Sequence, residues 1–462
     1  MNPSDKKAKN ITLTTGPIWR EILFFFFPIL IGAVFQQLYN TVDAVVVGQF
    51  AGSEALASVG GSSGQIVNFI FTFFTGLSSG ASVIIAQYFG AEDKEHVNST
   101  LHTAYAFSMI GGIVLGILGI IFCNPLLRLL QTPDTLMKDS ASYVRILMAG
   151  LIFTLIYNMG TGILRAIGDS RRPLYILIMA SLVNIVLDLL FVAGFSMGVL
   201  GAAIATVISQ AFSAAAVTYL LKKKTPGMEL KFREIRIHYS ILVRILRIGF
   251  PTAIASSMFS ISNMILQSSI NSFGVDTIAA WTAYGRIDVV WWLINQAFSI
   301  SITTFVGQNY GARKADRIKK ASREVLVIEI IAAIVAGFIV VLTAPYLVRL
   351  FDSSPDVIQI GRIMAMSIAP FYWVFCFIEI LSSVLRAEND VLFSTIANLV
   401  GICAFRAVWL LVIVRNSSLK LILASYPISY FLTAAVIIVY YLIRQPRILK
   451  KMESWAESLT ER

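Results

Sequence analysis

Charged residues are scarce in this sequence of 462 residues: Asp, Glu, Lys and Arg make up 14%, whereas 57% of the residues are hydrophobic. A soluble protein of this composition would expose apolar surface that it could not cover. Continuous apolar runs of about 20 residues recur along the chain, which is the length that a helix needs to cross a bilayer. The sequence therefore predicts an all-α integral membrane protein.

Cysteine is also rare. Cys123, Cys376 and Cys403 lie in or beside apolar runs without paired spacing, which excludes a disulfide framework and a cysteine-based zinc site. The chain has no phosphate-binding loop, nucleophile elbow or zinc motif. The net charge of +11 is concentrated in loops, so it indicates membrane orientation rather than a nucleic-acid partner. We therefore expect no enzymatic activity, no cofactor and no nucleic-acid binding.

The apolar runs predict twelve spans, at residues 20–48, 56–82, 98–122, 143–164, 173–193, 198–221, 239–271, 277–303, 323–345, 358–384, 391–414 and 418–443. Basic residues gather at the chain ends and after every second span, as at Arg171, Lys222, Arg313 and Lys314. The loops at 49–55 and 272–276 contain none. Both termini are therefore expected in the cytoplasm, in a multi-pass protein of the cell (inner) membrane. We expect the first span to be retained, because it lacks a small-residue cleavage pattern.

The two halves of the chain resemble each other. Phe27-Pro28 recurs as Phe250-Pro251, Gln87-Tyr88-Phe89-Gly90-Ala91 as Gln308-Asn309-Tyr310-Gly311-Ala312, and Leu164-Arg165-Ala166 as Leu385-Arg386-Ala387. The order is kept and the offset is always 221 or 223 residues. We therefore predict two six-helix lobes, 1–221 and 239–462, joined by a cytoplasmic linker at 222–238. An even number of spans gives the lobes the same orientation, related by a pseudo-two-fold axis along the membrane normal.

Two acidic segments lie at membrane depth in the first half. An aspartate in the middle of an apolar span costs about 3 kcal/mol, so Asp43 and Asp188 need a reason to be there. Asn184 precedes Asp188 by four residues, which puts both side chains on one helix face. We predict that Asp43 meets this face and that the three residues form a cation-binding pocket. The alternatives are that Asp43 reaches the water at a span end and that Asn184 and Asp188 only join helices.

The whole chain resembles the multidrug and toxic compound extrusion (MATE) transporters. The resemblance rests on Pro28 with Asp43 fifteen residues later, on Asp43-x-x-x-x-Gly48, on the paired Gln-x-x-Gly-Ala loops, and on Leu164-Arg165-Ala166-Ile167-Gly168-Asp169 followed by Pro173. It implies a coupling-cation cluster of Asp43, Asn184, Asp188 and Thr206, with Gln36, Tyr39 and Asn158 as supporting polar residues. It also implies coupling to H+ or Na+ and export of amphipathic, cationic compounds. Phe259 and Phe375 stand where one branch has acidic residues, so the chain resembles the branch with its cation site in the amino-terminal lobe.

Three further charges, Asp288, Glu379 and Arg406, lie within spans of the second half. Each would be costly alone at membrane depth, so we predict neutralised pairs, Asp288 with the nearby Arg286 and Glu379 with Arg406. Direct contact with a transported compound is the alternative reading of these three charges.

Together these features predict a secondary antiporter that works by alternating access, with Pro28 as the hinge of the first span. Its partners would be a small-molecule substrate and the lipid bilayer, and we expect a monomer. The rival function is a flippase for lipid-linked oligosaccharides or lipids on a related fold. Such a flippase would use a cationic cavity, whereas the central charges predicted here are acidic.

Overall fold

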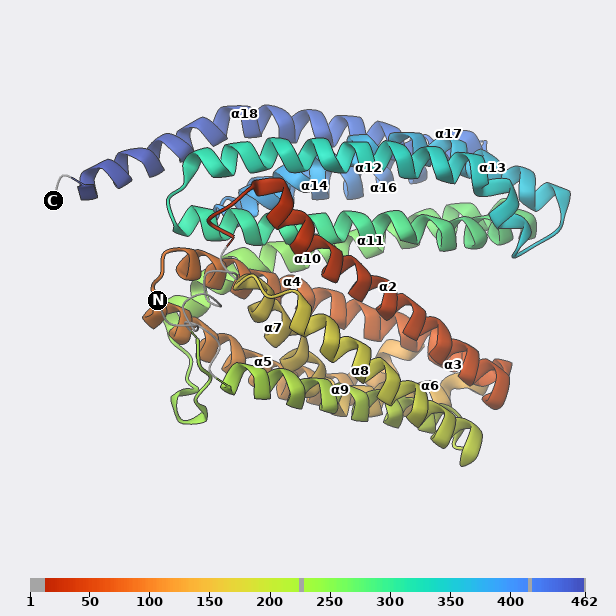
Figure 1. Ribbon diagram of the computed structural model, residues 1–462. Coiled ribbons are helices and arrows are strands. Elements are labelled where there is room, and N and C mark those ends of the chain that lie inside the picture. Colours follow the sequence, from red (N-terminus) through yellow and green to blue (C-terminus); the bar gives the residue numbers. More distant parts are fainter. Residues whose placement is uncertain (1–12, 224–227, 414–417, 461–462) are drawn as a thin grey trace. The chain divides into compact units, whose positions relative to one another are not determined.

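The computed structural model describes residues 13–223, 228–413 and 418–460, and within these ranges the chain is built from helices without β-strands (Figure 1). The helices of the first half are α2 (Ile18–Ala51), α3 (Ser53–Gly60), α4 (Ser62–Gly90), α5 (Lys94–Leu129), α6 (Asp134–Ala149), α7 (Leu151–Ala166), α8 (Arg171–Asp188) and α9 (Gly198–Lys222). Those of the second half are α10 (Tyr239–Asn271), α11 (Val275–Gly311), α12 (Ala315–Arg349), α13 (Pro355–Ile368), α14 (Tyr372–Ala387), α15 (Val391–Asn398), α16 (Phe405–Val408), α17 (Leu419–Leu423) and α18 (Ser425–Thr460).

The number of membrane spans agrees with the sequence. Eleven helices in the described ranges are long and apolar enough to cross a bilayer. The helices α6 and α7 are bent by 51° at the break between them, and they give a twelfth span if the pair counts as one span. The predicted all-α fold with twelve spans is confirmed. The fourth span begins earlier than predicted, at Asp134 rather than at residue 143. Its first turns carry Asp134, Lys138 and Asp139, so an apolar pattern could not reveal them.

Pi-helical segments interrupt two of the spans. One, Leu189–Gly194, directly follows α8, and the fifth span therefore changes its winding immediately after Asp188. Two more, Leu399–Ala404 and Trp409–Ile413, flank α16 on either side of Arg406. Such segments are rare and are frequent at functional sites. Asp188 and Arg406 are both charged residues that the sequence places within predicted spans.

The chain forms two compact units. Unit 1 contains Phe27–Ala253 and unit 2 contains Leu13–Phe26 with Ile254–Arg462, of which residues 414–417, 461 and 462 are not described. The divisions fall inside α2 and α10, next to Pro28 and Pro251. The predicted lobes were instead separated at the linker 222–238, of which residues 224–227 lie outside the described ranges. A boundary between repeats and a boundary between packed units are different things, so the division into lobes at this linker stays a prediction.

Close packing explains why the first half of α10 belongs to unit 1. A Cβ atom at Gly76 of α4 would lie 2.5 Å from Ala253 Cα, so only glycine permits this approach. Phe73 of α4 also meets Phe250 edge-on, with ring centroids 6.3 Å apart. Since each unit has its own buried apolar core, the packing of each half is self-sufficient.

The segment before α2 belongs to unit 2, where the repeated Gln-x-x-Gly-Ala loop holds it. The Leu13 backbone N–H donates to Gln308 Oε1 (2.9 Å), and Asn309 Nδ2 donates to the Leu13 carbonyl (3.1 Å). Arg317 Nη1 donates to the carbonyl of Gly16 (2.8 Å). The loop motif, used above only as a sign of internal repetition, therefore has a structural role in attaching this segment.

The described part of the polar linker, residues 228–238, is attached to α5 of unit 1. The Lys231 N–H donates to His102 Nε2 (3.0 Å), and the His102 Nδ1 lies 2.6 Å from the Asn98 carbonyl. The His238 N–H donates to Thr103 Oγ1 (3.2 Å). Burial is the main reason that the pKa of His238 lies below its usual value. This part of the linker is therefore held against α5 by hydrogen bonds.

Candidate functional site

The predicted polar cluster lies inside unit 1. Asn184 is 1% exposed and Asp188 is fully buried, and both belong to the continuous α-helix α8 as their spacing required. Asp43 comes from α2, which approaches α8 at Gly32: a Cβ atom there would lie 3.6 Å from the side chains of Leu174 and Leu177. The carboxyl groups of Asp43 and Asp188 are close enough to interact with each other. The structure thus brings Asp43 to the helix face that carries Asp188.

The polar atoms of this cluster are poorly satisfied. Both oxygens of Asp188, both polar atoms of Asn184, Asp43 Oδ1 and Ser181 Oγ are buried and lack a hydrogen-bond partner among the described residues. Ser181 precedes Asn184 by three residues and Asp188 by seven, so all three share one helix face. Unpaired buried polar groups each cost free energy, about 1–3 kcal/mol for a neutral group and more for a charged one. A group of unpaired buried polar atoms in one place is typical of a binding site.

Tyrosine and threonine side chains complete the cluster. The hydroxyl of Tyr39 interacts with Asp43, Asp188, Tyr143 and Thr206, so these five side chains converge from α2, α6, α8 and α9. Thr206, a predicted member, therefore lies at the cluster. Tyr143 was not predicted, because it sits near the polar start of its span and carries no charge.

A second unpredicted residue lies one turn beyond Thr206. Gln210 of α9 follows Thr206 by four residues, and its Oε1 is buried and has no hydrogen-bond partner in the described ranges. Helical periodicity places both side chains on the same face of α9, so the spacing from Thr206 could have revealed it.

Two of the predicted supporting residues bond within their own helices. Gln36 Nε2 donates to Asn40 Oδ1 at 3.4 Å, and Asn158 Nδ2 donates to the Thr154 carbonyl at 3.0 Å. Pro28, the predicted hinge, lies inside α2 two residues after the end of the unit 2 segment. It removes a backbone N–H from the helix at the point where α2 leaves that unit.

The Asp288 carboxyl group of unit 2 is held by uncharged hydrogen-bond donors instead of the predicted ion pair. Tyr284 donates to its Oδ1 (3.0 Å), the Tyr372 hydroxyl donates to the same oxygen, and Trp292 Nε1 donates to Oδ2 (2.7 Å). Arg286, the predicted partner, has an exposed side chain and makes no ion pair with it. The prediction of an ion pair was wrong because a helix turns by about 100° per residue, which points positions two apart to opposite sides.

The predicted pair of Glu379 and Arg406 is also wrong. Glu379 Oε1 accepts a hydrogen bond from Ser299 Oγ (2.5 Å) and lies 4.0 Å from Arg386 Nη2. Arg406 Nε donates instead to Ser429 Oγ (3.2 Å) of α18. The reason is that Glu379, on α14, faces α11, whereas Arg406 faces α18.

Unit 2 contains a buried acid that the sequence analysis missed. Glu329 of α12 is fully buried, its Oε1 accepts from Asn295 Nδ2 (2.9 Å), and its Oε2 has no partner within the part of the chain that the structure describes. Its charge interacts with that of Glu379. The rule that selected Asp43, an acid within an apolar run, applies equally to Glu329 in Val325-Leu326-Val327-Ile328-Glu329-Ile330-Ile331.

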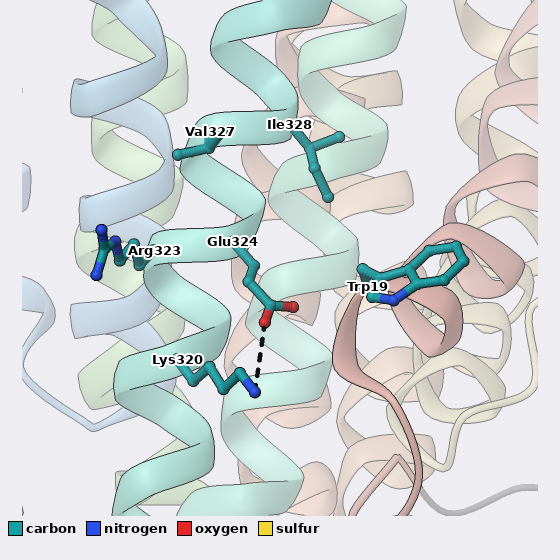
Figure 2. A pocket seen from close by; sticks show the side chains of 6 residues that line it. All are labelled: Trp19, Lys320, Arg323, Glu324, Val327 and Ile328. Atoms are coloured by element: carbon teal, nitrogen blue, oxygen red, sulfur yellow. Dashed lines mark ion pairs between the residues drawn. The ribbon is translucent and has the colours of Figure 1, made fainter.

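No group of three or more His, Cys, Asp or Glu side chains that could hold a metal ion occurs in the described ranges. A separate cavity of about 440 Å³ lies in unit 2, between the start of α2 and α12 (Figure 2). It is lined by Trp19, Lys320, Arg323, Glu324, Val327 and Ile328, with Lys320 Nζ 3.9 Å from Glu324 Oε1. None of the predicted site residues lines this cavity.

Comparison with known proteins gives consistent matches over most of the chain. The model of the MatE family matches residues 28–190 and 251–412, so each half carries one copy. A probable multidrug resistance protein, YoeA of Bacillus subtilis, is 28% identical over 92% of this chain and 93% of its own length. An FAD transporter of Shewanella oneidensis is 26% identical over 84% of this chain and 86% of its own.

Solved structures have the same fold. A MATE crystal structure in the bent conformation is 25% identical, with a TM-score of 0.88 over 96% of this chain and 99% of its own. An outward-facing multidrug resistance MATE family transporter gives the same TM-score and identity over 95% and 98% of the two chains. Because the MatE model covers more than half of the sequence, in both repeats, this chain belongs to the MATE family of membrane transporters, which are not enzymes.

Proposed function

We propose that this protein is a secondary active efflux transporter that exports amphipathic, cationic compounds in exchange for inward H+ or Na+. The single observation that carries the proposal is the buried group of unpaired polar atoms on Asp43, Asn184 and Asp188. Relatives named as probable multidrug resistance proteins support drug-like cargo. The acids of the cluster favour cationic cargo over the phosphate cargo of a flippase.

The two carboxyl groups explain how one ion can be bound and released. Asp43 and Asp188 interact across the α2–α8 contact, and two ionised carboxylates at such a position would repel each other in a medium of low dielectric. Either a shared proton or a sodium ion removes this repulsion. For sodium, the amide oxygen of Asn184 and the hydroxyl of Thr206 would complete an oxygen ligand set. In both cases the two acids act as one coupled site.

Binding must also change the conformation. An ion shifts an equilibrium between two states only if it binds one of them better. The α2 helix brings Asp43 to the site and contains Pro28 fifteen residues earlier, where the missing N–H weakens the helix. We propose that ion binding at Asp43 changes the bend of α2 at Pro28, and that two six-helix lobes in a cell (inner) membrane then rock, with both termini in the cytoplasm and the protein as a monomer.

The membrane supplies sufficient energy. A potential of about 100 mV provides roughly 2.3 kcal/mol for each positive charge that moves inward. Exchange of one singly charged cationic compound for one H+ or Na+ moves no net charge, so the ion gradient drives it: since about 1.4 kcal/mol corresponds to a tenfold ratio, a tenfold ion gradient supports about a tenfold substrate gradient, and the potential adds to it only when more positive charge enters than leaves.

The test of the function is transport by purified protein in liposomes. Vesicles containing a fluorescent cationic dye are given a pH gradient, a sodium gradient or neither, each at the same membrane potential. The proposal predicts dye movement against its gradient with one of the two ion gradients, and none when an ionophore removes that gradient. Dye movement that is equally fast with and without both gradients would contradict antiport.

A further inference from the structure

Arg406 is a buried cation in unit 2. Its side chain is 1% exposed, and Nε donates to Ser429 Oγ at 3.2 Å. The guanidinium lies over the ring of Tyr426, with Cζ 4.1 Å from the centroid, and 5.3 Å from that of Tyr430. Both tyrosines belong to α18, whose aromatic faces attract the cation.

Most of the hydrogen-bonding capacity of Arg406 is unused. Neither Nη1 nor Nη2 has a hydrogen-bond partner of good geometry among the described residues, although the guanidinium is close enough to the Tyr430 hydroxyl to interact with it, so most of its N–H donors are unmatched. No ion pair joins it to an acid in the same ranges, and Asp288 is already bonded by Tyr284, Tyr372 and Trp292. A guanidinium stays charged at any physiological pH. The rings of Tyr426 and Tyr430 and the Ser429 hydroxyl are neutral and compensate the buried charge only in part, and a buried charge without an ionic partner is destabilising, so packing alone does not explain this residue.

The surroundings of Arg406 indicate what would satisfy it. The two free nitrogens form the fork that binds a carboxylate or phosphate through two parallel hydrogen bonds. Beside it, Trp281 lies 6.4 Å from Tyr426 and 6.1 Å from Tyr284, between ring centroids. Trp281 is partly exposed, so this aromatic row connects the buried cation with the outside of the unit. A flat aromatic body fits such a row, with its acidic group at Arg406.

We propose that Arg406 binds the carboxylate or phosphate group of an aromatic compound that the protein transports. This inference rests on the proposed function and narrows its substrate class to aromatic compounds that carry an acidic group in addition to any basic one.

Binding to the purified, delipidated protein in detergent tests this directly, since it needs no ion gradient. The probe is 1-naphthoate, and 1-naphthamide serves as its uncharged analogue, both measured by calorimetry. We expect Arg406→Met to weaken naphthoate binding by roughly 10- to 100-fold, as for a lost charge-assisted bond, and to leave naphthamide binding unchanged. Arg406→Lys keeps the charge but loses the fork, so it should fall in between. Arg286→Met, which removes an exposed arginine of the same unit, is the matched control.

Thermal unfolding of the same variants separates binding from folding. Since Arg406→Met replaces an unsatisfied buried charge by an apolar side chain, its melting temperature should equal or exceed that of the wild type. A large decrease would show that the guanidinium is structural and would overturn the proposal, as would equal naphthoate affinity in wild type and folded Arg406→Lys.

A lipid headgroup could supply the same oxyanion, so phosphatidylglycerol and phosphatidylcholine, each dissolved in micelles of the same detergent, are tested as ligands. Arg406-dependent binding of phosphatidylglycerol without naphthoate binding would assign the site to lipid and overturn its role with a transported compound. Naphthoate binding that depends on Arg406 in a protein that shows no ion-driven dye efflux would refute the antiport proposal alone.

Discussion

Glu388 provides a quantitative test of burial outside the membrane spans. It follows α14, is 4% exposed, and its Oε1 accepts from Gln445 Nε2 at 2.7 Å. Burial raises the pKa of this carboxyl from 4.5 to about 8; the Gln445 hydrogen bond opposes the change and the charge of Asp390 adds to it. Glu388→Gln keeps the shape of the side chain and removes its titratable proton. We therefore expect it to abolish the pH dependence of stability that this carboxyl causes.

The sign follows from the protons bound. Below pH 4.5 both the folded and the unfolded chain hold the proton, and the contribution to stability is complete. As the pH rises towards 8, the unfolded chain releases its proton and the folded protein keeps it, so stability falls. At about 1.4 kcal/mol per pH unit, the loss is about 3 kcal/mol at pH 7 and up to about 5 kcal/mol at pH 8.

The assay is thermal unfolding of detergent-solubilised protein, followed by tryptophan fluorescence at several pH values between about 5 and 9. The wild-type melting temperature should fall relative to that of Glu388→Gln as the pH rises, so the variant gains most in alkaline buffer. Glu54→Gln, which removes an exposed carboxyl, controls for the change in net charge. A difference between wild type and Glu388→Gln that stays constant over this range would refute the reasoning.

Two further outcomes test the packing of α4 against α10 and the attachment of residues 228–238 to α5. Gly76→Leu should lower the free energy of unfolding by about 1–3 kcal/mol or more, because its side chain would collide with Ala253. Gly285→Ala, where a Cβ atom meets nothing within 4 Å, should be tolerated. Equal melting temperatures of the two variants would contradict this packing. Since burial lowers the pKa of His238, the unfolded chain takes up a proton first as the pH falls below 6.5, and the contact with Thr103 loses stability on the acid side. When the pH is lowered from about 7.5 to 5.5, the amide hydrogens of residues 228–238 should therefore exchange faster than the intrinsic pH dependence of exchange predicts, and this effect should be smaller in His238→Gln. Identical pH profiles of wild type and His238→Gln would argue against this role of His238.

The sequence predicted what depends on local pattern. Apolar run length was sufficient for the twelve spans, and a spacing of four residues correctly placed Asn184 and Asp188 on one face of α8. The polar start of α6 was missed because its first turns carry charges, which hide a helix from a pattern of apolar residues. Tyr143 was missed with it, although it interacts with Tyr39 at the cluster.

What failed was the choice of partners. A pairing rule based on charge and on neighbouring spans joined Glu379 to Arg406, but it holds no information on which way each helix face points. Ser299 and Ser383 donate to Glu379, which also lies 4.0 Å from Arg386, and two tyrosine rings lie beside Arg406. Uncharged partners are too common in a membrane protein to be selected from sequence. Sequence therefore predicts which charged residues lie within membrane spans, whereas only the fold shows which side chains they contact.

The role of Asp43 as the coupling residue is tested most directly by ion-driven dye efflux in liposomes containing Asp43→Asn. Wild type and Asp139→Asn, which changes an exposed aspartate of the same unit, serve as references, and folding of each protein is confirmed by its melting temperature. We expect Asp43→Asn to stop efflux under both a pH and a sodium gradient, because asparagine can neither release a proton nor supply a charged ligand. Efflux at the wild-type rate by well-folded Asp43→Asn protein would contradict it and would direct the search to Glu329, Glu379 and Asp288.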